Sequence, residues 1–272
     1  LIVDGRDPKP ASLTPPAEDL TKALPPYDPA AALRADGSGL VFIANPLNNQ
    51  PSRYSWRDQD AIIDTARDAV TLTNLDGTGY LRGPWVEVFN TDAARAYEPT
   101  LVFEYSALPE NGHFQEVNVY YHINRMQEYF QNDLGIPNAR NRVTNCYAHQ
   151  GSDDNSDYSF AEDRIRYGDG GVDDSDDGEV VVHEYGHAVH EDVVPGFVYS
   201  GETGAISEGI GDYFAALLGN NALLAEWDAT AYNPGPPPYL RRADNDKHYP
   251  EDFVGEVHDD GEIVSATFWD LR

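Results

Sequence analysis

Hydrophobic and polar positions follow two different periods along this chain. Between residues 36 and 112, short apolar runs alternate with turn residues, which predicts strands at Leu40–Ile43, Ala69–Leu72 and Trp85–Phe89. The segment Asn74–Gly79 has the composition of a turn between two of these strands. The alternation therefore predicts a β-rich N-terminal lobe.

The pattern changes to a helical period between Glu116 and Asp133, and Gly135 with Pro137 marks the end of this segment. We interpret the aromatic stripe on one face as core packing; it consists of Val119, Tyr120, Ile123, Met126, Gln127 and Phe130. Helical segments are also predicted further along, at Glu179–Val193, Gly204–Leu218 and Ile263–Leu271.

These elements divide the chain into four predicted regions. Residues 1–35 are rich in proline and are expected to form an extended or poorly ordered leader. Residues 36–112 form the β-rich region, residues 113–198 contain the first helix and a histidine-bearing helix, and residues 199–272 form a helical C-terminal lobe. The start at Leu1, without a signal-like block, suggests a trimmed, secreted product, with the leader as a possible remnant of an inhibitory propeptide.

The strongly negative net charge of the chain argues against some classes of binding partner. The chain has 47 acidic residues against 18 lysines and arginines, and its formal charge is −29. Such a surface repels nucleic acid and anionic membranes, and no apolar run is long enough for a membrane span. Either the protein is adapted to high salt, or clustered carboxylates bind calcium. The best calcium candidate is the run Asp173–Asp177, for which we favour a solvated acidic loop.

Cys146 is the only cysteine, so no disulfide can form within the chain. A lone thiol in a chain of this kind can act as a nucleophile, but a buried, unreactive side chain is the more common situation. We therefore expect Cys146 to be part of the core.

The segment His183-Glu184-Tyr185-Gly186-His187 carries the strongest chemical signal. One helical turn separates the two histidines, so both imidazoles project from the same face and can bind one metal ion. Zinc accepts neutral imidazoles and carboxylates, and a catalytic zinc keeps one position for water. Glu184 follows the first histidine, where its carboxylate can reach that water and act as general base.

A pair of acidic residues begins 21 positions after His187, at Glu208. Glu208 and Asp212 are four residues apart, so they share one face of the predicted helix. Glu208 can complete a His-His-Glu zinc site. Asp212 can accept a hydrogen bond from the second ring nitrogen of a ligand histidine and fix its tautomer.

With these two motifs, the chain resembles the thermolysin-like and fungalysin-like metallopeptidases, the gluzincins, over about Val117–Ile263. The resemblance implies an α+β fold with two lobes, a zinc-binding helix between them, and a mainly helical C-terminal lobe that would be truncated here. It also assigns roles to residues outside the zinc motif. Tyr199 and His258 would stabilise the oxyanion. Asn155, in the segment Asp154–Tyr158 that is similar to the family's substrate-binding edge strand, and Arg241, with Arg242 as the alternative, would hold the substrate.

The chain departs from the family pattern around His258. Phe253 stands five residues before it, where thermolysin has the aspartate that orients this histidine, so Asp252 or Glu256 would have to replace that aspartate. The spacing from His258 to Gly261 is closer to the fungalysin pattern. Residues 1–112 match no part of the family pattern that we can assign.

Together the motifs predict a secreted zinc-dependent endopeptidase that acts on protein or peptide substrates, with calcium as a second candidate cofactor. Two alternatives stay open at this stage. The chain could be a catalytically inactive relative that serves as a binding or adhesion module, or the zinc site could be structural. A set of three protein ligands leaves a position open for water, and Glu184 is placed to act on that water, so the catalytic interpretation is favoured.

Overall fold

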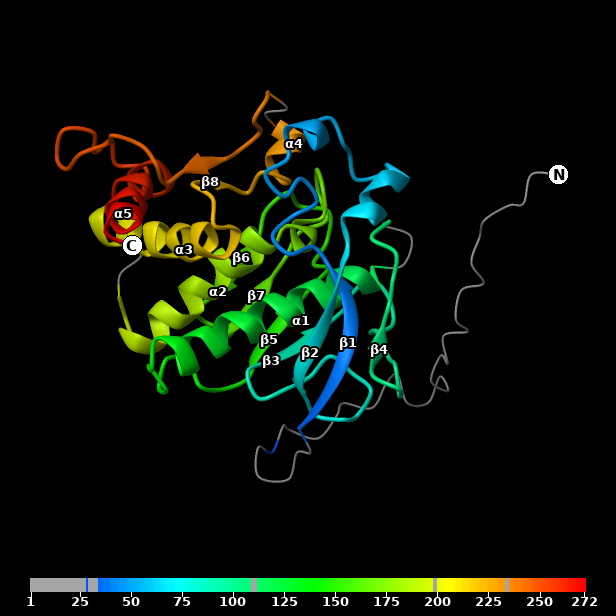
Figure 1. Cartoon of the computed structure of the whole chain (residues 1–272). Helices are drawn as coiled ribbons and strands as arrows, with labels where there is room; N and C mark the ends of the chain where they lie inside the picture. The colour runs from blue at the N-terminus through cyan, green and yellow to red at the C-terminus, as the bar shows by residue number, and fades with distance from the viewer. Residues whose placement is uncertain (1–27, 29–33, 109–111, 198–199, 233–234) are drawn as a thin grey trace.

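The computed structural model describes residues 28, 34–108, 112–197, 200–232 and 235–272. Several helices and small sheets of mixed strand direction make up the fold, which is compatible with the predicted α+β class (Figure 1). Most of the predicted leader, residues 1–35, lies outside the described residues.

The first sheet is formed by strands from the N-terminal part of the chain. Strand β1 (Ala35–Val41) lies in the middle, antiparallel to β2 (Asp68–Leu75) and parallel to β4 (Val102–Phe103). Short 3₁₀ turns at Pro51–Arg53 and Ala61–Ala66 lie between β1 and β2. The predicted strands at Leu40–Ile43 and Ala69–Leu72 are therefore confirmed in type, with shifted ends.

The second sheet has four strands in the order β3-β5-β7-β6. Strands β3 (Val86–Phe89), β5 (Thr144–Tyr147) and β7 (Arg164–Arg166) are parallel, and β6 (Asp157–Ser159) is antiparallel at the edge. The segment Asn74–Gly79 begins at the end of β2 and lies before β3, as predicted, but these two strands do not pair. The preceding strand β2 pairs with β1, whereas the following β3 pairs with β5, so this turn connects two different sheets.

Helix α1 (His113–Glu128) confirms the predicted helical segment and continues as a single π-helical turn to Asp133. Gly135, with a φ of 64°, ends it in the left-handed region that glycine adopts without strain. The other helices and short strands are α2 (Gly178–Val193), α3 (Gly201–Gly219), β8 (Leu223–Leu224), α4 (Ala229–Tyr232), β9 (Arg241–Arg242) and α5 (Val257–Leu271).

Helix α1 runs through the middle of the molecule, and its apolar stripe is buried, as predicted (Figure 1). One continuous hydrophobic core extends from Val41 in β1 to Trp227, just before α4. Cys146 is fully buried in this core, which confirms the expectation of an inaccessible thiol, and burial raises its pKa. Such a thiol is a poor nucleophile because the reactive form is the thiolate.

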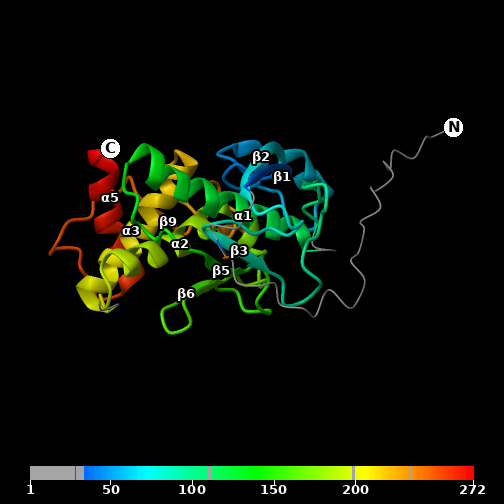
Figure 2. The same ribbon diagram turned by 90° about the horizontal axis from the view of Figure 1, so that it is seen from below.

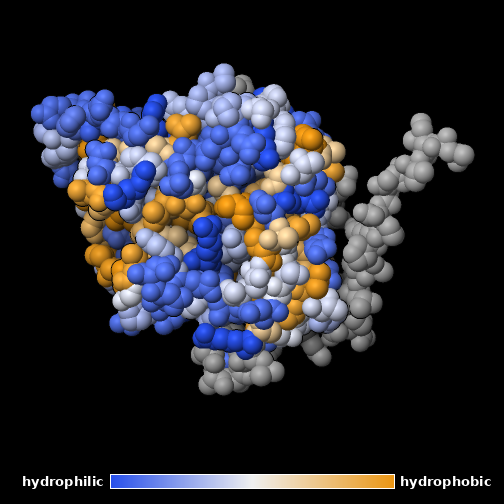
Figure 3. Space-filling model, in the orientation of Figure 1, coloured by the Kyte–Doolittle hydropathy of each residue, from blue (hydrophilic) through white to orange (hydrophobic). Residues whose placement is uncertain are grey.

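Helices α3 and α5 lie side by side at the end of the molecule opposite the first sheet (Figures 1 and 2). The face seen in Figure 3 is largely hydrophilic, with hydrophobic residues in scattered groups. Within the described residues, no helix has the length and apolar character needed to cross a membrane.

Candidate metal centre

Helix α2 is positioned at its start by a side-chain cap. The carboxylate of Asp177 accepts a hydrogen bond from the Glu179 backbone N–H at 3.0 Å, which satisfies one of the free donors at the helix N-terminus. The helix then runs without interruption to Val193. His183 and His187 are therefore one turn apart on the same face.

Two glycines allow α2 and α3 to approach closely enough to share a site. A Cβ atom on Gly186 would lie 2.9 Å from the Cα of Gly211, and one on Gly211 would lie 2.8 Å from Nδ1 of His183. Real Cβ atoms do not tolerate such distances, so side chains larger than hydrogen would push the helices apart. The close crossing brings the carboxylates of α3 into contact with the imidazoles of α2.

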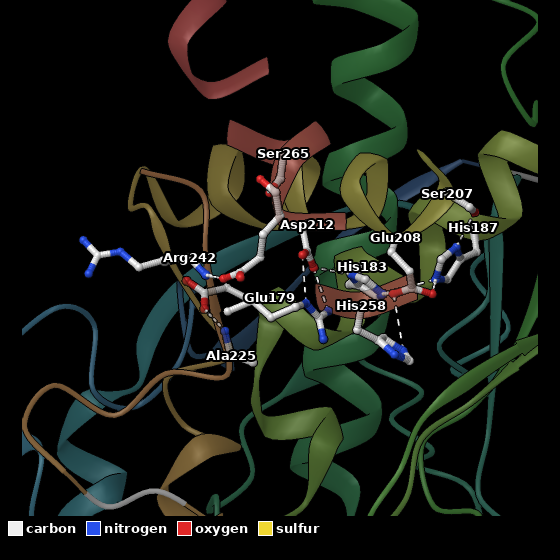
Figure 4. A network of polar contacts seen from close by, with 12 residues as sticks. Glu179, His183, His187, Ser207, Glu208, Asp212, Ala225, Arg242, His258 and Ser265 are labelled. Carbon is white, nitrogen blue, oxygen red and sulfur yellow. Dashed lines mark hydrogen bonds and ion pairs between the residues drawn. The ribbon is translucent and has the colours of Figure 1, made fainter. Parts of the chain in front are cut away.

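The three predicted metal ligands converge at this crossing (Figure 4). Nε2 of His183 lies 3.1 Å from Nε2 of His187. The Glu208 carboxylate lies 3.2 Å from the first of these nitrogens and 3.4 Å from the second. A zinc ion about 2.05 Å from each donor in tetrahedral geometry would separate neighbouring donors by about 3.3 Å. The observed triangle therefore has the dimensions of a zinc site.

The chemistry of the donors also fits a cation. Each ligand histidine has its Nδ1 next to an oxygen, Asp212 Oδ1 at 2.9 Å for His183 and Ser207 Oγ at 2.8 Å for His187. If these Nδ1 atoms carry the protons, the Nε2 lone pairs point at each other and at a carboxylate. Such an arrangement is repulsive unless a proton or a metal ion lies between the donors. The three groups can therefore hold one zinc ion.

Asp212 connects the metal ligands to Arg241. Its carboxylate accepts two hydrogen bonds from the Arg241 guanidinium, at 2.7 and 2.8 Å. Burial raises the pKa of Asp212, but Arg241 and His183 outweigh burial and lower it to about 2. In the metal-free protein, burial lowers the pKa of His183, whereas Asp212 and Glu208 raise it to about 10. Metal binding would displace that proton because a ligand imidazole is neutral.

Ser207 is a site residue that the sequence did not reveal. Its hydroxyl lies between two imidazoles, 2.8 Å from Nδ1 of His187 and 3.2 Å from Nδ1 of His190. Ser207 is buried and directly precedes Glu208. No spacing rule marks a serine at this position, so only the crossing of the helices identifies it.

His258 lies in the first turn of α5 and approaches the triangle from the solvent side. Its Nε2 lies 3.6 Å from Glu208, and its side chain is 53 % exposed. Glu256 caps α5 and lies 2.8 Å from Nδ1 of His258, so this acid occupies the orienting position. Asp252 instead accepts a hydrogen bond from the His248 backbone. His258 does not belong to the group of close metal-ligand atoms, which contains three side chains.

A cavity of about 260 Å³ opens beside His183, one of the three predicted ligands. Glu184, Arg241 and Asn155 all line it, together with His183 and His258. Asn155 is exposed just before edge strand β6, and its Nδ2 donates to the Ser156 carbonyl at 3.1 Å. Substrate-sized groups can therefore reach the metal centre from a space that also contains the predicted base.

Arg242, the alternative to Arg241, lies outside this cavity. It points away from the ligands, and its guanidinium pairs with the exposed Asp244 at 2.7 Å (Figure 4). Tyr199, the predicted oxyanion donor, lies outside the described residues.

The prediction that Asp173–Asp177 forms a solvated acidic loop is wrong. All five residues are buried, and the middle of the run forms a 3₁₀ turn at Asp174–Asp176. The run lies between α1 and the start of α2. Burial and the nearby Asp58 carboxylate raise the pKa of Asp173 to about 7. The sequence could not distinguish this turn from a surface loop because acidic residues are usually solvated.

Asp58 joins the run although 115 positions separate it from Asp173. Carboxylate oxygens of Asp58, Asp173 and Asp176 all lie within 4.8 Å of one another. Gln115 donates to Asp173 at 3.2 Å and to Asp176 at 2.9 Å. Asp58 Oδ1 and Asp176 Oδ2 are buried without a hydrogen-bond partner among the described residues. Unpaired buried carboxylate oxygens are costly, and a cation would satisfy them.

No model of a known protein family matches this chain. A search of curated proteins likewise gives no match. The geometry and chemistry of the candidate metal centre and its cavity therefore carry the proposed function.

Proposed function

We propose that the protein is a zinc-dependent endopeptidase. The observation that supports this most directly is the triangle of His183, His187 and Glu208, whose donor spacing suits tetrahedral zinc, and one of whose members, His183, lines the cavity. A catalytic rather than structural zinc follows because the close ligand group among the described residues has three members and not four.

Zinc in this position supplies a Lewis acid and lowers the pKa of water. The carboxylate of Glu184 takes a proton from the attacking water and delivers it to the leaving amine. His258 donates a hydrogen bond to the developing oxyanion, and one such donor typically lowers the barrier by about 3–4 kcal/mol. Asn155 and Arg241 hold the peptide backbone, so that the scissile carbonyl is aligned with these groups.

The wider proposal follows the gluzincin resemblance. This resemblance implies two lobes with α2 between them and a secreted protein. It also implies that Tyr199 is a second oxyanion donor. Protein or peptide chains are the proposed substrates.

Metal content and chelation test this function. Elemental mass spectrometry of the purified protein is expected to show about one zinc ion per chain. A chelator that removes this zinc should abolish casein hydrolysis. Added zinc should restore it. If the protein bound one equivalent of zinc but hydrolysed no peptide, the result would instead support a binding or adhesion module. Hydrolysis that persists in the metal-free protein would contradict the proposal.

Calcium is a separate proposal that concerns stability. We propose that Asp58, Asp173 and Asp176 bind one calcium ion, because two of their oxygens are buried and unpaired. At a free concentration about 100-fold above its Kd, calcium should stabilise the zinc-loaded protein by about 2.7 kcal/mol, measured by thermal unfolding.

Asp58→Asn should remove most of the calcium response, whereas Asp68→Asn, at an exposed position of β2, should keep it. An equal response in both variants would show that calcium binds elsewhere. No response in the unmodified protein would refute the calcium site.

A further inference from the structure

The cavity beside the metal centre has an acidic wall that the proposed chemistry does not use. Carboxylate oxygens of Asp154, Asp174 and Asp228 lie within 4.8 Å of one another, and all three residues line the cavity. They come from the loop before β6, the 3₁₀ turn before α2 and the segment before α4. Three parts of the chain thus place three carboxyl groups around one point.

Among the described residues, no lysine or arginine forms an ion pair with this wall, although the charge of Arg241 acts against the rise in the pKa of Asp228. Asp228 is 6 % exposed, and its Oδ1 has no hydrogen-bond partner among the described residues. Asp174 is 3 % exposed and accepts one hydrogen bond, from Ser156 Oγ at 2.6 Å. Arg241 also lines the cavity, but both of its hydrogen bonds to a carboxylate go to Asp212.

Burial and neighbouring carboxylates raise the pKa of both buried acids in this wall, Asp174 and Asp228. Burial and the Asp228 carboxylate raise the pKa of Asp174 to about 8. Burial and the Asp177 carboxylate raise the pKa of Asp228 to about 7. A cation that entered the cavity would favour the charged form of both groups.

The remaining walls suit a long side chain with an apolar stem. Val180, Ala215, Leu224 and Leu240 line the same cavity that holds His183 and Glu184. Lysine and arginine bury their methylene groups against such surfaces while the charged end reaches polar partners. A volume of about 260 Å³ exceeds what a single metal ion fills, and a side chain would occupy both the apolar and the acidic part.

We propose that this acidic pocket, formed by Asp154, Asp174 and Asp228, binds the lysine or arginine side chain of a substrate residue that flanks the scissile bond. The inference rests on the proposed peptidase function and names the substrate class. The pocket is continuous with the catalytic groups, so a side chain seated there would hold the adjacent peptide bond near the metal centre.

Matched fluorogenic peptides test the pocket directly. One series carries arginine, its neutral isostere citrulline, or leucine at each of the two positions that flank the scissile bond. The zinc-loaded protein should cleave the arginine peptide with a kcat/KM about 10- to 100-fold above that of the citrulline peptide, because a charge-assisted hydrogen bond is lost.

Asp228→Asn and Asp174→Asn should each reduce the ratio of arginine to citrulline cleavage, and this ratio is compared with the rate for the leucine peptide in the same variant. Burial makes the charged form of both acids unfavourable, so a neutral amide should be tolerated and both variants are expected to fold, which thermal unfolding checks. Asp153→Asn provides the control. It neutralises an exposed aspartate next to Asp154 that does not line the cavity, and the ratio should stay unchanged.

The outcomes separate this inference from the proposed function. Cleavage of all three peptides at similar rates overturns the pocket and leaves the peptidase function standing. No cleavage of any peptide by zinc-loaded protein overturns both. A preference for arginine that disappears when calcium is added, with calcium bound in proportion, would assign the pocket to a divalent ion and overturn the inference.

Discussion

Glu184→Gln is expected to bind zinc as the unmodified protein does and to lose about 10²–10⁴-fold in kcat/KM for peptide hydrolysis. Glutamine has nearly the same shape as glutamate, but its amide cannot accept the proton of the attacking water. Glu184 lines the cavity and does not belong to the close ligand group, so the substitution leaves the three donor atoms in place. Zinc content and cleavage of a fluorogenic peptide are measured on the same preparation.

Glu191→Gln is the matched control on the same helix. Glu191 lies in the last turn of α2, where its carboxylate accepts a hydrogen bond from the Gly196 backbone at 3.0 Å. This variant should keep full activity. Equal rates for Glu184→Gln and the unmodified protein would refute the assignment of the base, whereas loss of zinc in Glu184→Gln would show that Glu184 supports the metal site itself.

Asp212→Ala should both destabilise the protein and weaken zinc binding. Asp212 is 1 % exposed and pairs with Arg241, so its removal leaves a guanidinium without its carboxylate. Breaking a buried ion pair from one side costs about 3–5 kcal/mol. Loss of the acid next to Nδ1 of His183 should also reduce zinc affinity about 10- to 100-fold. Urea unfolding of the metal-free protein and zinc competition with a chromophoric chelator measure the two effects.

Asp244→Ala tests whether any aspartate–arginine pair would give the same result. Asp244 pairs with Arg242 at 2.7 Å, but both side chains are more than 40 % exposed. A surface pair contributes at most about 1 kcal/mol, and zinc affinity should not change. If Asp212→Ala behaved like Asp244→Ala in both measurements, Asp212 would have no role in supporting the metal centre.

Strong local periodicity explains which elements could be predicted. Segments such as 116–133 and 179–193 place apolar residues at helical spacing, so helices are found there with ends shifted by a few residues. The histidine pair one turn apart shares a face for the same reason. Arg241 and Arg242, adjacent in sequence, could not be separated until the structure placed one in the cavity and the other on the surface.

Errors arose where the environment depends on distant parts of the chain. The acidic run at Asp173–Asp177 has the composition of a surface loop, yet it is buried because α1 and α2 pack around it. The turn at Asn74–Gly79 was recognised, but pairing of β2 with β1 and of β3 with β5 is decided by long-range contacts.

The sequence by itself determined the helical segments and the position of His183, His187 and Glu208 on helix faces, since these depend on spacings of three or four residues. Only the tertiary structure decided that Gly186 and Gly211 let two helices cross, that Ser207 lies beside His187, and that Asp58 joins Asp173. It also assembled Asp154, Asp174 and Asp228 into one wall. Residues so far apart meet through packing of the whole chain, and a local pattern contains no information about that packing.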